Sequence, residues 1–166
     1  MRRKKSWNDK LHNSQGLPKI ETIKSKMSKK WGIGTCVIPT PLDVDNLMKK
    51  PGAGELITIN QIRSALAMKY DTSIACPLTT GIFAWVAANA ADELARAGGQ
   101  GQGQGQGQTI TPYWRTLKTG GELNKKYPGG IENHKALLEL EGHVVVKRGK
   151  RYFVENFENN LVSFYG

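Results

Sequence analysis

The sequence predicts a mainly α-helical domain with small β elements, arranged as a winged helix-turn-helix. Two segments with apolar residues at helical spacing, within 58–70 and 77–94, are joined by the short polar turn Asp71-Thr72-Ser73. Farther along, two runs rich in β-branched and aromatic residues flank Arg148-Gly149-Lys150, a pattern typical of a β-hairpin with a basic tip, the shape of a wing. Many helical hairpins share the first pattern, and a charged, soluble turn is the alternative explanation of the second.

We expect three parts along the 166 residues, which suffice for one domain with a core and flexible flanks. Residues 1–35 form a basic N-terminal arm, residues 36–143 the winged helix domain, and residues 144–166 a C-terminal β-hairpin extension. The Gly-Gln repeat of residues 98–108 is predicted to be a flexible loop, because it can neither fill a core nor hold a helix. Its strict period, without a Lys-Ser/Thr pair after it, argues against a phosphate loop for a nucleotide.

The net charge of +10 is concentrated in the N-terminal arm. Residues 1–30 contain ten Lys/Arg against Asp9 and Glu21, whereas the other 136 residues carry fourteen Lys/Arg and twelve Asp/Glu. Such an arm suits a polyanion, because each phosphate that it neutralises releases counterions. A solubilising, partly disordered tail is the alternative.

Start and stop signals place the helices in order. In the arm, apolar residues at helical spacing predict one short helix that docks on the domain. In the domain, one helix follows the cap Thr40, with Pro41 at its first position, and another follows the capping box Thr58-Ile59-Asn60-Gln61. A last helix over 131–141 ends at Gly142. The apolar residues of the arm are Ile20, Ile23 and Met27, followed by Gly32 and Gly34.

The cysteines and histidines do not form a metal-binding pattern. Cys36 and Cys76 lie forty residues apart, and the three histidines show no ligand spacing with them, so neither a metal site nor a structural disulfide is expected. No cofactor is expected either. Cys76 directly precedes Pro77 at a predicted helix start, where the helix dipole favours a thiolate, so Cys76 is a candidate nucleophile. An inert buried cysteine is the alternative.

A stiff aromatic segment follows the Gly-Gln repeat. Pro112 fixes its own φ and restricts Thr111 to extended conformations. Tyr113 and Trp114, followed by Arg115, could therefore line a slot in which a flat ring stacks on the aromatic faces. Positions in a core or on an edge strand are the alternative for the two aromatic residues.

Several motifs occur in one order: Pro112-Tyr113-Trp114-Arg115, Gly120-Gly121, Gly129-Gly130 and Leu137-Leu138-Glu139-Leu140-Glu141-Gly142. This order resembles the active-site loop and closing helix of the O6-alkylguanine-DNA alkyltransferases. Residues 54–62 resemble the start of the first DNA-binding helix of that family, so the resemblance covers roughly residues 40–143.

Two departures from the family pattern decide what this resemblance implies. Tyr113 stands in place of the family's reactive cysteine, and Trp114 in place of the histidine that activates it. A phenol is a poor nucleophile near neutral pH, and an indole cannot relay a proton. The chain is therefore most similar to the alkyltransferase-like proteins, which lack the cysteine, bind alkylated guanine and do not repair it.

The resemblance also implies roles for particular residues. Tyr113, Trp114 and Arg115 would line the pocket for a modified base. Leu78 stands at the position of the family's intercalating arginine, so an apolar wedge would take the place of the arginine. Ile59 replaces the tyrosine that helps to rotate the target nucleotide. The residues expected to contact DNA are Thr58, Leu78, Thr79, Thr80, Gly81, Lys147, Arg148, Lys150 and Arg151.

We therefore expect a non-enzymatic DNA-binding protein that recognises alkylated guanine in duplex DNA in a DNA-repair context. The alternatives are active alkyl transfer to Cys76, and a DNA-binding or interaction module that has lost lesion recognition. The expected partners are double-stranded DNA and an excision-repair protein. No membrane association is expected, because the longest apolar run, 81–88, is far shorter than a span of about 20 residues. Because no signal peptide is recognisable, we expect the protein in the cytoplasm; in a prokaryote it would be associated with the nucleoid.

Overall fold

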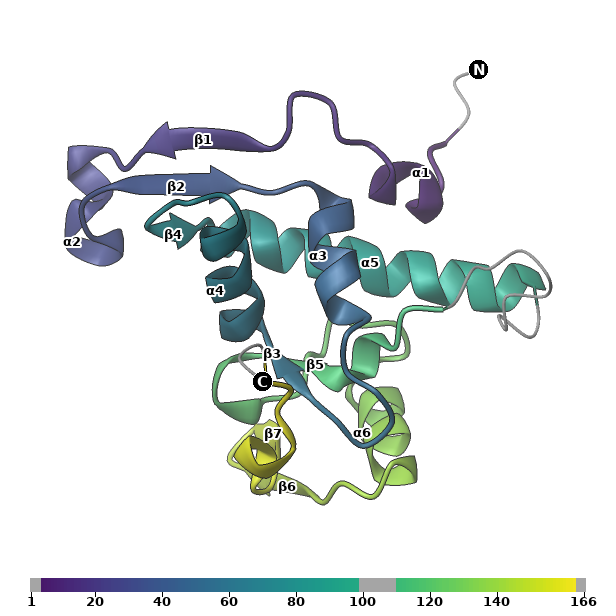
Figure 1. Cartoon of the computed structure of the whole chain (residues 1–166). Helices are drawn as coiled ribbons and strands as arrows, with labels where there is room; N and C mark the ends of the chain where they lie inside the picture. The colour runs from purple at the N-terminus through teal and green to yellow at the C-terminus, as the bar shows by residue number, and fades with distance from the viewer. Residues whose placement is uncertain (1–3, 99–109, 164–166) are drawn as a thin grey trace.

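The computed structural model describes residues 4–98 and 110–163, and it confirms the mainly α-helical class with small β elements. The long helix α5 runs across the molecule, with α1 and α3 packed along it and α4 near its start (Figure 1). The predicted Gly-Gln loop lies outside the described residues, except for Gly98 at the end of α5. The helices are α1 (Trp7–Leu11), α2 (Ser28–Trp31), α3 (Pro41–Met48), α4 (Ile59–Lys69), α5 (Pro77–Gly98) and α6 (Gly130–Leu140).

The strands form three small sheets. Strand β2 lies between an antiparallel partner, β1, and a parallel partner, β4. A parallel pair, β3 and β5, joins the start of α4 to the segment after Tyr113, and an antiparallel hairpin, β6–β7, forms the predicted wing. The strands are β1 (Lys19–Thr22), β2 (Thr35–Ile38), β3 (Ile57–Thr58), β4 (Ile74–Ala75), β5 (Thr116–Leu117), β6 (Val145–Arg148) and β7 (Arg151–Val154).

Helices α4 and α5 form the predicted helix-turn-helix. The capping box at the start of α4 is present: the Thr58 hydroxyl accepts from the Gln61 amide at 3.2 Å, and the Gln61 side chain accepts from the Thr58 amide at 3.1 Å. Between the helices the chain forms β4, whose neighbour Cys76 donates its backbone N–H to the Val37 carbonyl at 2.9 Å. The connection is therefore tied to β2 by backbone hydrogen bonds, in addition to the predicted polar turn.

The N-terminal segment differs from the single helix expected there. Ile20 lies in β1 and is exposed, Ile23 is buried, and Met27 ends a 3-10 turn, so the three residues share no helical stripe. The physical reason is the long-range pairing of β1 with β2, which sequence spacing does not reveal.

Helix α1 also docks on the domain. The Trp7 ring packs edge-on against Trp85 of α5 at 4.7 Å between centroids. The Glu93 carboxylate accepts the backbone N–H groups of Trp7 and Asn8 at 3.0 and 3.1 Å, and so satisfies donors left free at the start of α1. Helix α1 is therefore packed on α5, whereas β1 is exposed and is held through its pairing with β2.

The core includes a large cluster around α3, α4 and α5, a smaller one under the wing, and a third at the base of β1 and β2. Helix α5 buries mainly small side chains, including Ala84, Ala87 and Ala88, which lets its neighbours approach closely. Within the described ranges, no helix is both long and apolar enough to cross a membrane. The smaller cluster contains Leu56, Leu117, Leu123, Leu138 and Val154.

Candidate nucleic-acid interface

The loop expected to line a base pocket is packed into the interior. Tyr113 is 6% exposed, and its ring packs edge-on against Trp114 and Tyr127, with centroids 5.5 and 5.6 Å away. The Tyr113 hydroxyl accepts a hydrogen bond from the Asn133 side chain at 3.1 Å, and burial raises the pKa of the phenol. Tyr113, Trp114 and Arg115 do lie together, but they form a filled part of the interior rather than an open slot.

Arg115 is occupied by internal partners. Its Nε and Nη2 donate to the Glu141 carboxylate at 2.9 and 2.5 Å, and its Nη1 donates to the Pro51 carbonyl at 2.9 Å. Burial would raise the pKa of the Glu141 carboxyl, but the hydrogen bonds and charge of Arg115 outweigh that effect and lower it. This forked contact joins the Tyr113 loop to the end of α6 and to the chain after α3, so Arg115 positions the loop.

His134 of α6 holds the same loop from the other end. Its Nε2 lies 2.8 Å from the Trp114 carbonyl, and its Nδ1 lies 3.2 Å from the Asn124 backbone nitrogen. A carbonyl only accepts and a backbone amide only donates, so the ring is neutral with its hydrogen on Nε2. Burial lowers the pKa of His134 to about 4, which agrees with that assignment. From the sequence, His134 was considered only as a metal ligand, and no local pattern indicated that it bridges Trp114 and Asn124.

An open pocket of about 450 Å³ lies beside this loop, between the start of α5 and strand β7. Tyr127, whose ring contacts Tyr113, forms part of its wall, and Gly81 and Arg151 are the members of the predicted DNA-binding set that reach it. Its volume lies within the range of small-molecule sites. The sequence did not indicate this pocket. Other residues of its wall are Ala84, Leu117, Lys118 and Asn124.

The residues at the starts of α4 and α5 that were predicted to contact DNA differ in exposure. Leu78 is 69% exposed and Gly81 is also exposed, as a groove-facing role requires. Thr58 and Thr80 are buried, because the first caps α4 and the hydroxyl of the second donates to the Cys76 carbonyl at 2.7 Å. These two threonines therefore hold the helices in place and do not face outward. Thr79 is half-buried, and its hydroxyl has no hydrogen-bond partner among the described residues.

The exposed face of α5 is apolar. Ile82 and Trp85 are exposed together with Leu78, and the Trp85 ring also packs edge-on against Trp7. Positions 78, 82 and 85 follow one another at helical spacing, so they form one continuous stripe on the first three turns. We call Leu78, Ile82 and Trp85 the α5 stripe.

The wing presents basic side chains at its tip. Lys147, Arg148 and Lys150 are exposed, and none of them forms an ion pair with a residue that the structure describes. Arg151 instead pairs with Glu122 at 2.6 Å, and this contact, more than any other, lowers the pKa of the Glu122 carboxyl. Three of the four predicted wing cations are therefore available to an anionic partner.

Cys76 packs in an apolar cluster with Ile23 and Cys36. The pKa of the neighbouring Cys36 thiol is raised to about 11, mainly by burial, so that thiol stays protonated. Neither cysteine lines the pocket beside the wing. In the part of the chain that is described, no three His, Cys, Asp or Glu side chains are grouped as metal ligands.

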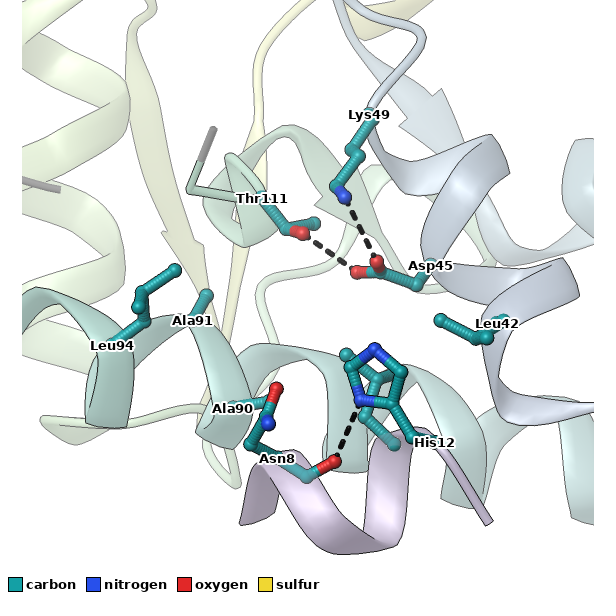
Figure 2. A pocket seen from close by; sticks show the side chains of 10 residues that line it. Asn8, His12, Leu42, Asp45, Lys49, Ala90, Ala91, Leu94 and Thr111 are labelled. Atoms are coloured by element: carbon teal, nitrogen blue, oxygen red, sulfur yellow. Dashed lines mark hydrogen bonds and ion pairs between the residues drawn. The ribbon is translucent and has the colours of Figure 1, made fainter. Parts of the chain in front are cut away.

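A smaller cavity of about 210 Å³ lies between α1, α3 and α5 (Figure 2). The buried Asp45 carboxylate accepts from the Thr111 hydroxyl at 2.6 Å and pairs with Lys49 at 3.2 Å. Both carboxylate oxygens are thus used by the protein. Figure 2 shows the His12 ring across the cavity from this pair, with its Nδ1 2.9 Å from the Asn8 carbonyl. Asp45 therefore anchors the chain that enters the Tyr113 loop.

Comparisons with known proteins add one similar structure. No protein-family model matches the chain, and no curated protein matches it. Among solved structures, the chain is similar to S. pombe Atl1, solved in complex with damaged DNA containing O6-carboxymethylguanine. The identity is 16%, the TM-score is 0.47, and the match covers 74% of this chain and 94% of that chain. We transfer no residue role from this likeness.

Proposed function

We propose that this protein is a non-enzymatic DNA-binding protein of the alkyltransferase-like type, which recognises alkylated guanine in duplex DNA. The observation that carries the proposal is the pocket of about 450 Å³ between the start of α5 and the wing. In a winged helix-turn-helix, these two elements lie against the duplex. A pocket at that place can receive a base that has left the helical stack.

The surroundings of the pocket suit such a base. Tyr127 offers an aromatic wall, and Ala84 and Leu117 offer apolar surface. The polar part of the wall consists of Lys118, Thr119, Glu122, Asn124 and Arg151. Leu78, exposed on the first turn of α5, is the apolar side chain that would fill the gap left in the stack.

The backbone of the duplex is the expected partner of the wing. Lys147, Arg148 and Lys150 would contact phosphates, which fix orientation without reading sequence. Their contribution should therefore be equal for modified and unmodified duplexes, and the pocket alone should distinguish the two.

The absence of transfer chemistry is the second half of the proposal. The Tyr113 hydroxyl is bonded to Asn133 in the interior, and Cys76 packs with Ile23 and Cys36. Incubation with O6-methylguanine DNA is expected to leave the intact protein mass unchanged. A gain of one methyl group, lost in a Cys76→Ser variant, would establish transfer to Cys76 and contradict this half of the proposal.

Competition binding tests recognition. An O6-methylguanine duplex is expected to displace a labelled probe at a lower concentration than an otherwise identical guanine duplex, and the difference should persist as salt is raised. Equal competition by the two duplexes would show that lesion recognition is absent. Failure of both to bind would exclude DNA as the partner.

A pocket-filling variant tests the location. Nothing lies within 4 Å of a Cβ added at Gly81, so Gly81→Leu fits on α5 and extends into the pocket. We expect this variant to lose the preference for the lesion while it binds plain duplex through the wing. Ala97→Leu, at an exposed site near the other end of α5, is the matched control. Preference retained in Gly81→Leu would place the base elsewhere.

A further inference from the structure

The connection between β1 and β2 carries a second cluster of free cations. Four lysines lie in it, and no Asp or Glu occurs from residue 22 to residue 42. All four are exposed, and none forms an ion pair with a residue in the described part of the chain. We call this segment, residues 23–34, the β1–β2 tip; its lysines are Lys24, Lys26, Lys29 and Lys30.

The wing has the same charge pattern. It holds four Lys/Arg within residues 147–151, and no Asp or Glu occurs from residue 142 to residue 154. Both segments connect antiparallel strands, the first through a 3-10 turn and α2 and the second through a short turn, and both concentrate positive charge without a carboxylate in the connection. Surfaces of this kind attract phosphates through charge alone.

The base of the β1–β2 tip is joined to the chain between α4 and α5. Thr35 and Ser73 share two hydrogen bonds: the Ser73 N–H donates to the Thr35 carbonyl at 3.0 Å, and the Thr35 N–H donates to the Ser73 side-chain hydroxyl at 3.1 Å. Strand β2 then pairs with β4, which leads directly into α5. Ile23 at the base of the tip is buried against Cys36 and Cys76. The backbone at the base of the tip is therefore fixed relative to the start of α5, and the exposed lysines lie on the segment beyond it.

The two basic turns lie on different sides of the helix-turn-helix. In Figure 1, α4 lies between α2, which forms part of the β1–β2 tip, and the hairpin β6–β7. A duplex that meets the start of α5 and the wing would continue past α4 toward the tip. The phosphates of that duplex are the groups that exposed lysines would contact there.

We propose that the β1–β2 tip is a second clamp for DNA phosphates, so that the protein holds the duplex on both sides of the helix-turn-helix. The inference rests on the DNA binding of the proposed function, and it does not depend on lesion recognition. The inference assigns phosphate binding to the folded segment 23–34, whereas the sequence alone indicated only that residues 1–35 are basic.

The test removes two charges from the tip and two from elsewhere. The variant Lys29→Gln/Lys30→Gln is compared with Lys50→Gln/Lys135→Gln, whose side chains lie near the end of α3 and on α6. Each phosphate contact contributes about 0.9 to the slope of log K against log salt. The tip variant is expected to lower the slope for an unmodified duplex by about 1.8, so its deficit in affinity should be about tenfold larger at 50 mM than at 200 mM salt.

The outcomes separate this inference from the proposed function. The control pair should match wild type, and Lys29→Arg/Lys30→Arg should restore the wild-type slope, because charge and not shape is the cause. If wild type binds duplex DNA and the tip variant keeps the wild-type slope and affinity, the clamp is overturned while the proposed function stands. If wild type binds no duplex, both are overturned.

Discussion

Lowering the pH is expected to destabilise the fold through His134. The neutral imidazole donates from Nε2 to the Trp114 carbonyl and accepts at Nδ1 from the Asn124 amide. A protonated ring would place an N–H group against the Asn124 N–H, in a site that excludes water. Both partners belong to the chain beside the candidate pocket, and Asn124 lines it, so this contact supports the pocket wall.

The size and sign of the effect follow from the pKa. Burial lowers the pKa of His134 from an ordinary 6.5 to about 4. As the pH falls, the unfolded chain takes up this proton near pH 6.5 and the folded protein only near pH 4, so the unfolded state binds more protons between these values. The stabilisation is complete above pH 6.5 and is lost as the pH falls. The full loss is about 3 kcal/mol, of which about 2 kcal/mol is reached at pH 5.

Urea unfolding at pH 7.5 and pH 5.0 measures this loss. The wild type is expected to lose about 2 kcal/mol more than His134→Gln, which cannot take up the proton. His143→Gln is the matched control, because burial also lowers the pKa of His143. Carboxyl groups whose pKa is lowered, such as Glu141, contribute mainly at more acidic pH. An equal loss in wild type and His134→Gln, or a loss abolished by His143→Gln instead, would refute the reasoning.

Three further substitutions test the internal contacts by urea unfolding. Arg115→Lys keeps the charge but loses the forked contact with Glu141, so we expect a cost of about 1–3 kcal/mol; no change would show that a single ammonium suffices. Gly121→Ala should cost about 2 kcal/mol or more, because Gly121 has φ +84° and the new Cβ would lie 2.5 Å from Phe157; wild-type stability would mean that the Phe157 ring moves freely. Tyr113→Phe should cost about 1 kcal/mol and leave lesion preference unchanged, since the hydroxyl points inward; a lost preference would place Tyr113 in the site.

The helix-turn-helix could be predicted because its signals are local. The capping box at Thr58 and Gln61 needs only four consecutive residues, and it forms as expected. The cap at Thr40 with Pro41 forms in the same way, and Gly142 takes the left-handed conformation predicted after α6, with φ +90°. These interactions are decided within one turn of the chain, so packing elsewhere did not override them.

The orientation of α5 could not be predicted, because burial there does not follow hydrophobicity. Ala84 and Ala87 face the core, where neighbouring helices approach closely, while Ile82 and Trp85 remain exposed. The spacing of apolar side chains therefore predicted the helix but not which of its faces is buried. Thr80, expected to contact DNA, is buried, and the pairing of β1 with β2 across residues 23–34 was also outside the reach of local patterns.

The apolar face of α5 limits how the proposed DNA binding could discriminate among DNA sites. The side chains of Leu78 and Ile82 have no hydrogen-bonding group, and Trp85 has a single donor, so the α5 stripe cannot read the donor and acceptor pattern of base edges in the major groove. The free cations on the wing and on the β1–β2 tip would contact phosphates, which carry no sequence information. If the protein binds DNA as proposed, its affinity for plain duplex should hardly depend on sequence and should depend strongly on salt. Any selectivity must then come from the pocket beside Tyr127, where a base that leaves the stack would be held.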